Sequence, residues 1–166
     1  MDELPVVESA RLTLRPAREA DVAALLEILA EPDVLTWWGR YDAARVLEEL
    51  PGTYAIVVGG AVAGWLQVHE EAEPDYPSVA FDIVVATRLR GGGYGREALR
   101  AAIGDYAARG HHRFTIDPST ENERAIRAYA AIGFKPVGVL RRYERAPDGR
   151  WRDGLLMDLL ADELVE

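Results

Sequence analysis

Hydrophobic and polar positions alternate through much of the first half of the chain, which is the pattern of β-strands. Residues 11–15 alternate between leucine and an arginine or threonine, and this predicts a half-buried strand. Apolar runs at 53–58 and 61–69 are separated only by a Gly-Gly pair at 59–60. Because both glycines can adopt positive φ, the two runs predict a tight hairpin. The mostly apolar run at 79–85 predicts a further strand.

Four segments show helical spacing instead. Apolar residues at i, i+3, i+4 and i+7 predict a helix over 22–29. Residues 42–50 predict a second, short helix with an aspartate as its N-cap. A third helix follows a glycine-rich loop and ends at Gly110, and a fourth contains Tyr129 and ends at Gly133.

The second half of the chain alternates strands with these helices. Strands are predicted at 112–116, 134–140 and 152–160, the last two joined around a Pro-Asp-Gly turn at 147–149. The order is an antiparallel meander, then strand–helix–strand–helix–strand, then a closing hairpin. This order predicts one α/β or α+β domain over residues 1–166.

Charge and composition narrow the choice of partners. The 166 residues carry 19 Lys+Arg and 28 Asp+Glu, a formal charge of −9. Nucleic acids and anionic membranes are recognised mainly through clustered lysine and arginine, so we expect neither as a partner, whereas a cationic small molecule or peptide fits this balance. The chain has no cysteine, which excludes disulfides, thiolate metal sites and covalent catalysis on a thiol.

Location and metal content follow from what the sequence contains. Residues 1–5 are acidic where a signal peptide is basic, and no apolar stretch approaches about 18 residues. We therefore expect a soluble cytoplasmic protein. The three histidines, His69, His111 and His112, lack metal-ligand spacing with any nearby acid pair, and no metal is assigned.

The glycine-rich loop before the third helix is a candidate anion site. Glycine lets the backbone approach a ligand closely, and the first N–H groups of a helix are unpaired donors at the positive end of its dipole. Arginines flank the loop in an otherwise acidic chain, as expected for a pyrophosphate guest. A plain glycine-rich turn is the alternative. The loop reads Arg90, Gly91, Gly92, Gly93, Tyr94, Gly95, Arg96.

Two common phosphate-binding motifs do not fit this loop. A P-loop requires Gly-Lys-Ser/Thr, but Gly95 is followed by Arg96 and Glu97. A dinucleotide-binding Gly-x-Gly-x-x-Gly beginning at Gly91 fails at Arg96. Asp117 follows the next strand, where a ribose-binding acid could lie, yet the chain has too few βα units for a doubly wound fold.

The loop does match Arg90-x-x-Gly93-x-Gly95, and here the chain resembles the GNAT superfamily of N-acetyltransferases, whose acetyl-coenzyme A loop is Gln/Arg-x-x-Gly-x-Gly/Ala. Strand 81–85 before the loop and a helix after it agree with that family. The resemblance implies a central mixed, mostly antiparallel sheet with helices on both faces, and acetyl-coenzyme A (acetyl-CoA) as cosubstrate.

A second motif extends the resemblance over nearly the whole chain. After the next strand come Asn122, a helix with Tyr129, and Gly133-Phe134 leading into a strand. With Thr36-Trp37-Trp38-Gly39 and the segment 117–129, the chain looks like aminoglycoside 6'-N-acetyltransferases. Broader relatives are acetyltransferases of ribosomal-protein N-termini and acylases of siderophore lysines. The acidic loop 70–75 and the basic hairpin 141–152 depart from the drug-modifying enzymes and leave the amine open.

Acetyl transfer to an amine needs a neutral nitrogen, a polarised thioester carbonyl and a proton for the departing thiolate. By the resemblance, Asp82 holds the substrate ammonium and accepts its proton, and Tyr129 protonates the coenzyme A sulfur. The alternatives are a half-exposed strand residue for Asp82 and a core tyrosine for Tyr129. The resemblance also implies that backbone N–H groups near Val84 and Val85 polarise the acetyl carbonyl where two neighbouring strands splay.

The remaining assignments concern the walls of the site. Asn122 bonds the pantetheine arm or caps its helix. Asp117 orients the amine or caps a turn. Trp37 and Trp38 are expected to bind substrate; since adjacent residues cannot share one face of a helix or strand, we expect one of them to line a pocket. The residues expected to contact acetyl-CoA are Val84, Val85, Arg90, Gly91, Gly92, Gly93, Tyr94, Gly95, Arg96 and Asn122.

The leading hypothesis is therefore an N-acetyltransferase that acts by direct attack in a ternary complex on a primary amine of a cationic small molecule such as an aminoglycoside. One alternative is the same chemistry on a protein N-terminus or lysine. A second alternative, of a different class, is a coenzyme A-binding regulator without catalysis. The protein is expected to be a monomer or a homodimer.

Overall fold

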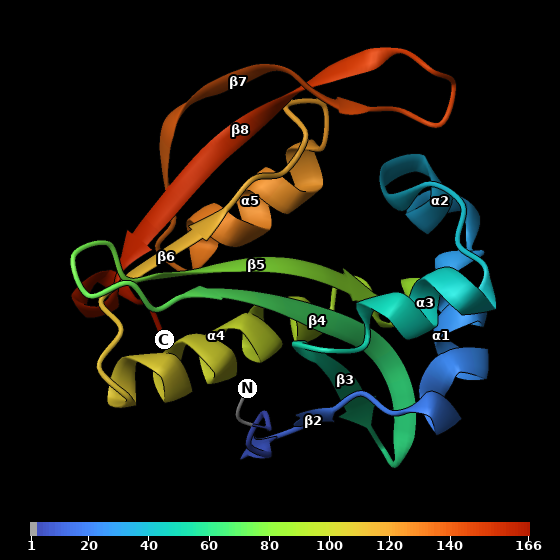
Figure 1. The fold of residues 1–166 in the computed structure, drawn as a ribbon, viewed down its shortest axis with the longest axis horizontal. Helices are drawn as coiled ribbons and strands as arrows, with labels where there is room; N and C mark the ends of the chain where they lie inside the picture. The colour runs from blue at the N-terminus through green and yellow to red at the C-terminus, as the bar shows by residue number, and fades with distance from the viewer. Residues whose placement is uncertain (1–2) are drawn as a thin grey trace.

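A single twisted sheet of eight strands organises residues 3–166, the part of the chain that the computed structural model describes (Figure 1). In space the strands follow the order β1-β2-β3-β4-β5-β6-β8-β7. Their bounds are β1 Val7–Glu8, β2 Thr13–Pro16, β3 Thr53–Val58, β4 Ala61–Glu71, β5 Ser78–Val85, β6 Arg113–Ile116, β7 Lys135–Arg145 and β8 Trp151–Leu160. The helices are α1 Val22–Leu29, α2 Pro32–Trp38, α3 Ala43–Glu49, α4 Tyr94–Ala108 and α5 Glu123–Ala131.

The connections confirm the predicted mixed, mostly antiparallel sheet. Strands β1 to β5 form an antiparallel ladder, and β5 pairs with β6 in parallel after the crossover through α4. Strand β8 then enters between β6 and β7, antiparallel to both, so β7 lies at the edge. The predicted Gly-Gly hairpin joins β3 and β4, and both of its glycines have positive φ.

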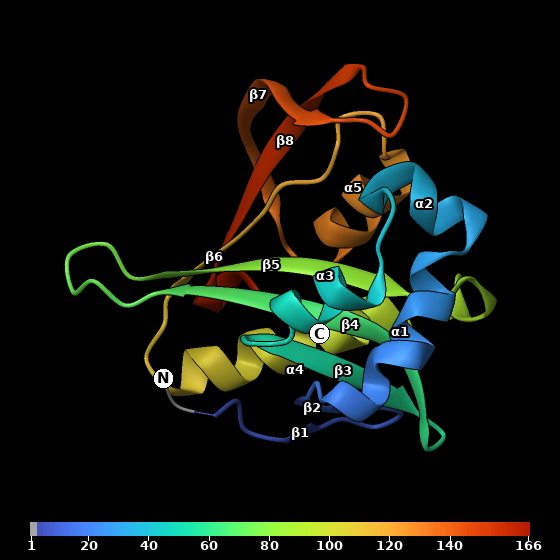
Figure 2. The ribbon, with the colours of Figure 1, turned by 45° about the vertical axis from the view of Figure 1, so that its right-hand side comes forward.

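Apolar side chains form two cores, one on each side of the central strands. Leu66, Val79 and Phe81 pack with the buried stripe of α4, which includes Leu99 and Ile103. The other core joins α1, α2 and α3 to the opposite face of β4 and β5 (Figure 2). Because strand residues alternate between faces, the polar positions of β4 and β5 lie on the second face. The site is built there.

Helix α2 and the length of β7 differ from the sequence prediction. The hydrophobic pattern did not predict α2, which Pro32 opens at its first turn, where proline needs no N–H acceptor. Strand β7 continues to Arg145, five residues beyond the predicted end, with two irregularities in its pairing with β8.

Within residues 3–166 no helix is both long enough and apolar enough to cross a bilayer.

Gly64 on β4 leaves no space for a side chain beside the backbone of β5. A Cβ built there would lie 2.1 Å from the backbone oxygen of Val84. We expect Gly64→Ala to lower the free energy of unfolding by at least about 3 kcal/mol, because neither backbone can move without breaking the ladder. Gly104→Ala is the matched control, since Gly104 lies within α4 with open space around it.

Gly104→Ala should raise the free energy of unfolding by roughly 0.5–1 kcal/mol through helix propensity. Urea unfolding midpoints of the two variants and the wild type measure both effects. Equal midpoints for Gly64→Ala and wild type would show that the close approach at Gly64 is not a constraint.

Candidate active site

Strands β5 and β6 separate part-way along their length. Their pairing ends at Ala80 opposite Thr115, whereas β5 continues to Val85. Beyond Ala80, that edge of β5 has no strand neighbour. The backbone N–H of Ala86 donates to the oxygen of Ala63 on β4 at 2.7 Å. By the alternation of an antiparallel ladder, the amide of Val84 also faces β4, and the amide of Val85 faces the open edge.

The loop before α4 is shaped to present backbone amides. Gly91 and Gly93 have φ of 78° and 80°, which L side chains rarely adopt. Gly93 is the N-cap residue, and no side chain caps the helix there. The first amides of this 15-residue helix therefore have neither an intrahelical acceptor nor a capping acceptor. They lie at the positive end of the dipole, as the sequence predicted.

A cleft of about 770 Å³ lies between this loop and the N-terminal half of α5. The open end of β5, including Val84 and Val85, forms its floor. Six of the seven residues of the predicted loop line it; Gly92 does not. Arg90 is partly engaged, because its Nη1 lies 3.0 Å from the Asp33 carboxylate. Three further arginines line the cleft, namely Arg96, Arg124 and Arg127.

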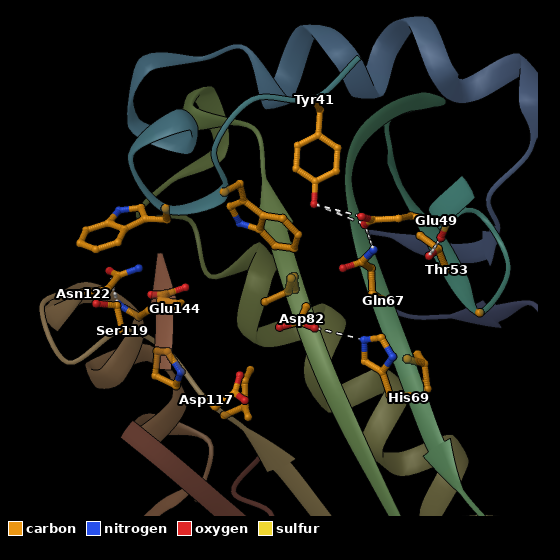
Figure 3. Close-up of a pocket in the computed structure, with 18 of the residues that line it drawn as sticks. Tyr41, Glu49, Thr53, Gln67, His69, Asp82, Asp117, Ser119, Asn122 and Glu144 are labelled. Carbon is orange, nitrogen blue, oxygen red and sulfur yellow. Dashed lines mark hydrogen bonds and ion pairs between the residues drawn. The ribbon is translucent and has the colours of Figure 1, made fainter. Parts of the chain in front are cut away.

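A second cleft, of about 590 Å³, adjoins the first along β5 and is strongly acidic. Its carboxylates come from α3, β5, the end of β6 and β7, and Figure 3 shows several of them around the opening. Among residues 3–166 no lysine or arginine lines it, and its one histidine is His69. The acidic residues are Glu48, Glu49, Asp82, Asp117 and Glu144.

The two clefts meet along a shared set of residues. These belong to α2, β5 and the start of α5, so a molecule in either cleft would contact the other at this line. The shared residues are Trp37, Trp38, Ile83, Asn122, Ala125 and Tyr129. Asp82 and Val85, three residues apart on β5, lie on opposite sides of this line.

Asp82 points into the acidic cleft and is not buried. Its side chain is 43% exposed, and its Oδ2 lies 3.1 Å from Nε2 of His69 on the neighbouring strand β4 (Figure 3). The carboxylate therefore has both a partner and access to water, which removes the large cost of burying a charge in an apolar strand. Asp82 faces away from Val79 and Phe81, which lie in the opposite core, as the two-residue period of a strand requires.

Glu49 is a second positioned carboxylate in this cleft. It accepts hydrogen bonds from Nε2 of Gln67 at 2.6 Å and from the Tyr41 hydroxyl at 3.3 Å. Burial, together with the charge of Glu49, raises the pKa of Tyr41 to about 12, so that the phenol stays protonated and keeps donating. Arg45 Nε also lies 3.5 Å from Glu49 Oε1, so two uncharged donors and one arginine orient this carboxylate.

Asp117 and Glu144 lie across the cleft from Asp82 (Figure 3). The Tyr143 hydroxyl donates to Asp117 Oδ2 at 2.5 Å, so the aspartate is held by the hairpin after α5 rather than by a turn of its own. Burial raises the pKa of both acids above the ordinary value. The basic hairpin thus contributes an acid and a phenol to the site.

Tyr129 lies on the line between the clefts, as a proton donor to a sulfur there would require. Its ring packs against Phe134 at 6.3 Å between centroids. Burial and the nearby charges of Asp82 and Asp117 raise the pKa of its hydroxyl, which keeps it protonated at neutral pH. Asn122 caps α5, accepting from Ala125 N at 3.2 Å, and also lines both clefts, so the cap does not exclude the predicted contact with the pantetheine arm.

Both tryptophans line the clefts, whereas the sequence predicted only one to do so. They form the C-terminal end of α2. Trp38 packs on the buried Trp65 at 5.7 Å between centroids. Trp37 is fixed by Arg152 of β8, whose side chain is 4% exposed and donates to the backbone oxygen of Thr36 at 2.8 Å. A short helix held at its end can thus present both rings.

Sequence reasoning missed His69, Glu49, Gln67 and Tyr41. Two of them carried a signal. Gln67 and His69 alternate with Leu66 and Val68 on β4, so they share the face that carries Asp82 on β5. Conversely, none of residues 70–77 lines either cleft, and the acidic loop lies outside the site.

Among residues 3–166 no group of three or more histidine or acidic side chains could hold a metal ion.

Comparison with known proteins decides the family. Residues 11–135 match the acetyltransferase (GNAT) domain. The chain belongs to the GNAT acetyltransferase family. It is therefore an acetyl-CoA-dependent N-acetyltransferase, as the loop and helix motifs predicted.

Individual GNAT relatives differ in the amines named for them. The chain is 28% identical to an aminoglycoside N(6')-acetyltransferase type 1 of Klebsiella pneumoniae, over 83% of this chain and 79% of that protein. It is 27% identical to a [ribosomal protein bS18]-alanine N-acetyltransferase of Haemophilus ducreyi, over 48% of this chain and 54% of that protein. The structure of Mycobacterium smegmatis RimJ in complex with CoA-disulfide matches with a TM-score of 0.84 and 27% identity, covering 98% of this chain and 90% of that one.

Proposed function

We propose that this chain acetylates a primary amine of a cationic small molecule, with an aminoglycoside 6'-amine as the first candidate, by direct transfer from acetyl-CoA. The observation that carries the proposal is the acidic cleft, which among residues 3–166 is lined by five carboxylates and by no lysine or arginine. Outside the lining, Arg45 and Arg152 lie 3.5 Å from Glu49 and 3.4 Å from Glu144, which leaves Glu48, Asp82 and Asp117 without an arginine or lysine partner among these residues. A molecule with several ammonium groups is the natural complement of such a surface. The likeness to the Klebsiella enzyme supports the same choice.

The larger cleft fits the coenzyme. Unpaired amides at the start of α4 and the cations Arg96, Arg124 and Arg127 suit phosphate groups. The bend at Gly91 and Gly93 keeps side chains away from this approach. When bound there, acetyl-CoA would supply the activated acetyl thioester. A site in this position leaves the acidic cleft free for the amine, so both substrates can be present together.

The residues near the line where the two clefts meet then have separate roles in the transfer. Asp82 attracts the ammonium group and takes up its proton, which leaves a neutral nitrogen for attack. The backbone N–H of Val85, which faces the open edge of β5, donates to the acetyl oxygen and favours the charge that develops on it. Tyr129, kept protonated by its raised pKa, donates its proton to the leaving sulfur.

A second candidate function is acetylation of a protein N-terminus, which the likeness to the Haemophilus [ribosomal protein bS18]-alanine N-acetyltransferase favours. A panel assay for release of free coenzyme A thiol separates the two, with aminoglycosides, linear polyamines and N-terminal peptides as amines. We expect the highest kcat/KM for a polycationic small molecule. Turnover of peptides alone would replace the first candidate by the second. Coenzyme binding without turnover of any amine would support the non-catalytic regulator.

A further inference from the structure

His69 contacts Asp82 but has no role in the acetyl transfer proposed above. It lies on β4 with its side chain on the cleft face, two residues beyond Gln67. Its Nε2 is 3.1 Å from Asp82 Oδ2, and its side chain is 61% exposed. One end of the imidazole therefore contacts the carboxylate that faces the amine, while much of the ring remains open to water.

Among the described residues, every other charged side chain that lines the cleft with His69 is a carboxylate, and Arg45 and Arg152 pair with two of these, Glu49 and Glu144, from outside the lining. Asp82 faces it from β5, Asp117 from the end of β6 and Glu49 from the end of α3. Glu48 and Glu144 line the same cleft, and no arginine or lysine does. These carboxylates, above all the hydrogen bond with Asp82, raise the pKa of His69 against the opposing effect of partial burial.

A proton taken from an ammonium group needs an acceptor that holds it near neutral pH. A carboxyl group in water ionises near pH 4, whereas imidazole titrates near 6.5, much closer to the conditions of the reaction. A carboxylate in contact with an exposed imidazole can therefore transfer to the imidazole a proton that the carboxylate alone would bind only weakly near neutral pH. The separation of 3.1 Å is that of a hydrogen bond, so the transfer requires no movement of either strand.

We propose that His69 is the final acceptor of the amine proton, acting through Asp82, and that it releases this proton to solvent. The inference rests on the proposed acetyl transfer. One proton moves: an N–H bond of the ammonium breaks, an N–H bond of the imidazolium forms, and the Asp82–His69 pair changes from net charge −1 to 0. In this role His69 acts through Asp82 and not on the atoms that form the new amide bond.

The pH dependence of turnover tests the proposal. At saturating acetyl-CoA, we expect kcat/KM of the wild type to fall as the pH decreases through the raised pKa of His69. His69→Gln keeps a polar side chain within reach of Asp82 but cannot take up a proton. It should lose this acidic limb and lower kcat by roughly tenfold, less than the hundredfold or more typical of direct acid–base groups. His112→Gln is the matched control, because His112 is exposed and lies outside both clefts.

A second measurement needs no catalysis. Proton NMR of the imidazole rings should show one histidine that titrates above 6.5, that disappears in His69→Gln and that moves to lower pH in Asp82→Asn. Full kcat with an unchanged acidic limb in His69→Gln overturns the inference and leaves the proposed function intact. An amine panel without turnover removes the proposed function and the proton transfer with it, even where the NMR shift confirms the ion pair.

Discussion

Asp82→Asn is expected to lower kcat/KM for the amine by about two to four orders of magnitude while leaving acetyl-CoA affinity nearly unchanged. The amide keeps the shape of the carboxylate but carries no charge and cannot accept the ammonium proton. Because the side chain is already 43% exposed, the substitution should cost little stability. Steady-state kinetics with the best amine of the panel, and coenzyme A titrations of the same samples, measure the two effects.

Asp75→Asn is the control for the change in net charge, since Asp75 is exposed and lies outside both clefts. Its kinetics should equal those of the wild type. Wild-type kcat/KM in Asp82→Asn would show that the proton leaves by another route, and the roles given to both Asp82 and His69 would then fall.

Gly93→Val is expected to weaken coenzyme A binding by at least about 100-fold, because the branched side chain would stand where phosphates approach the helix N-terminus. The substitution also has a conformational cost, since Gly93 has φ of 80° and valine strongly disfavours that region. A loss of stability in Gly93→Val would therefore not show that the loop binds phosphate. The comparison needs a variant with the same strain at another place.

Gly110→Val supplies that variant. Gly110 follows the other end of α4, has φ of 105°, and has open space around it. Both variants should lose stability, measured by urea unfolding at a temperature where each is folded, but only Gly93→Val should lose affinity for coenzyme A. Equal affinities in the two variants would contradict the assignment of the loop as the phosphate site.

The glycine loop and the strand before it could be predicted because their signals are local. The backbone at Gly93 must turn within a few residues, and the amphipathic stripe of α4 follows at once. The facing of Asp82 also followed from the two-residue period of β5. These features depend on neighbours in the chain, which is why spacing and pattern alone place them.

The acidic cleft could not be predicted in the same way, because it assembles from elements distant in sequence. Asp117 and Glu144 approach each other only because β8 enters the sheet between β6 and β7. Trp37 is positioned by Arg152, 115 residues further along the chain. The partner of Asp82 is His69 only in the register that places Gln67 opposite Asp82. Pairing and register are tertiary outcomes that periodicity does not fix.

The central claim is that the cleft at the start of α4 holds acetyl-CoA with its thioester at the line between Asp82 and Tyr129. Equilibrium dialysis of the purified protein against labelled acetyl-CoA tests this most directly. We expect one molecule bound per chain, with unlabelled coenzyme A in competition and with binding lost in Gly93→Val but kept in Asp82→Asn. No binding at millimolar acetyl-CoA, or equal binding by Gly93→Val and the wild type, would contradict the claim.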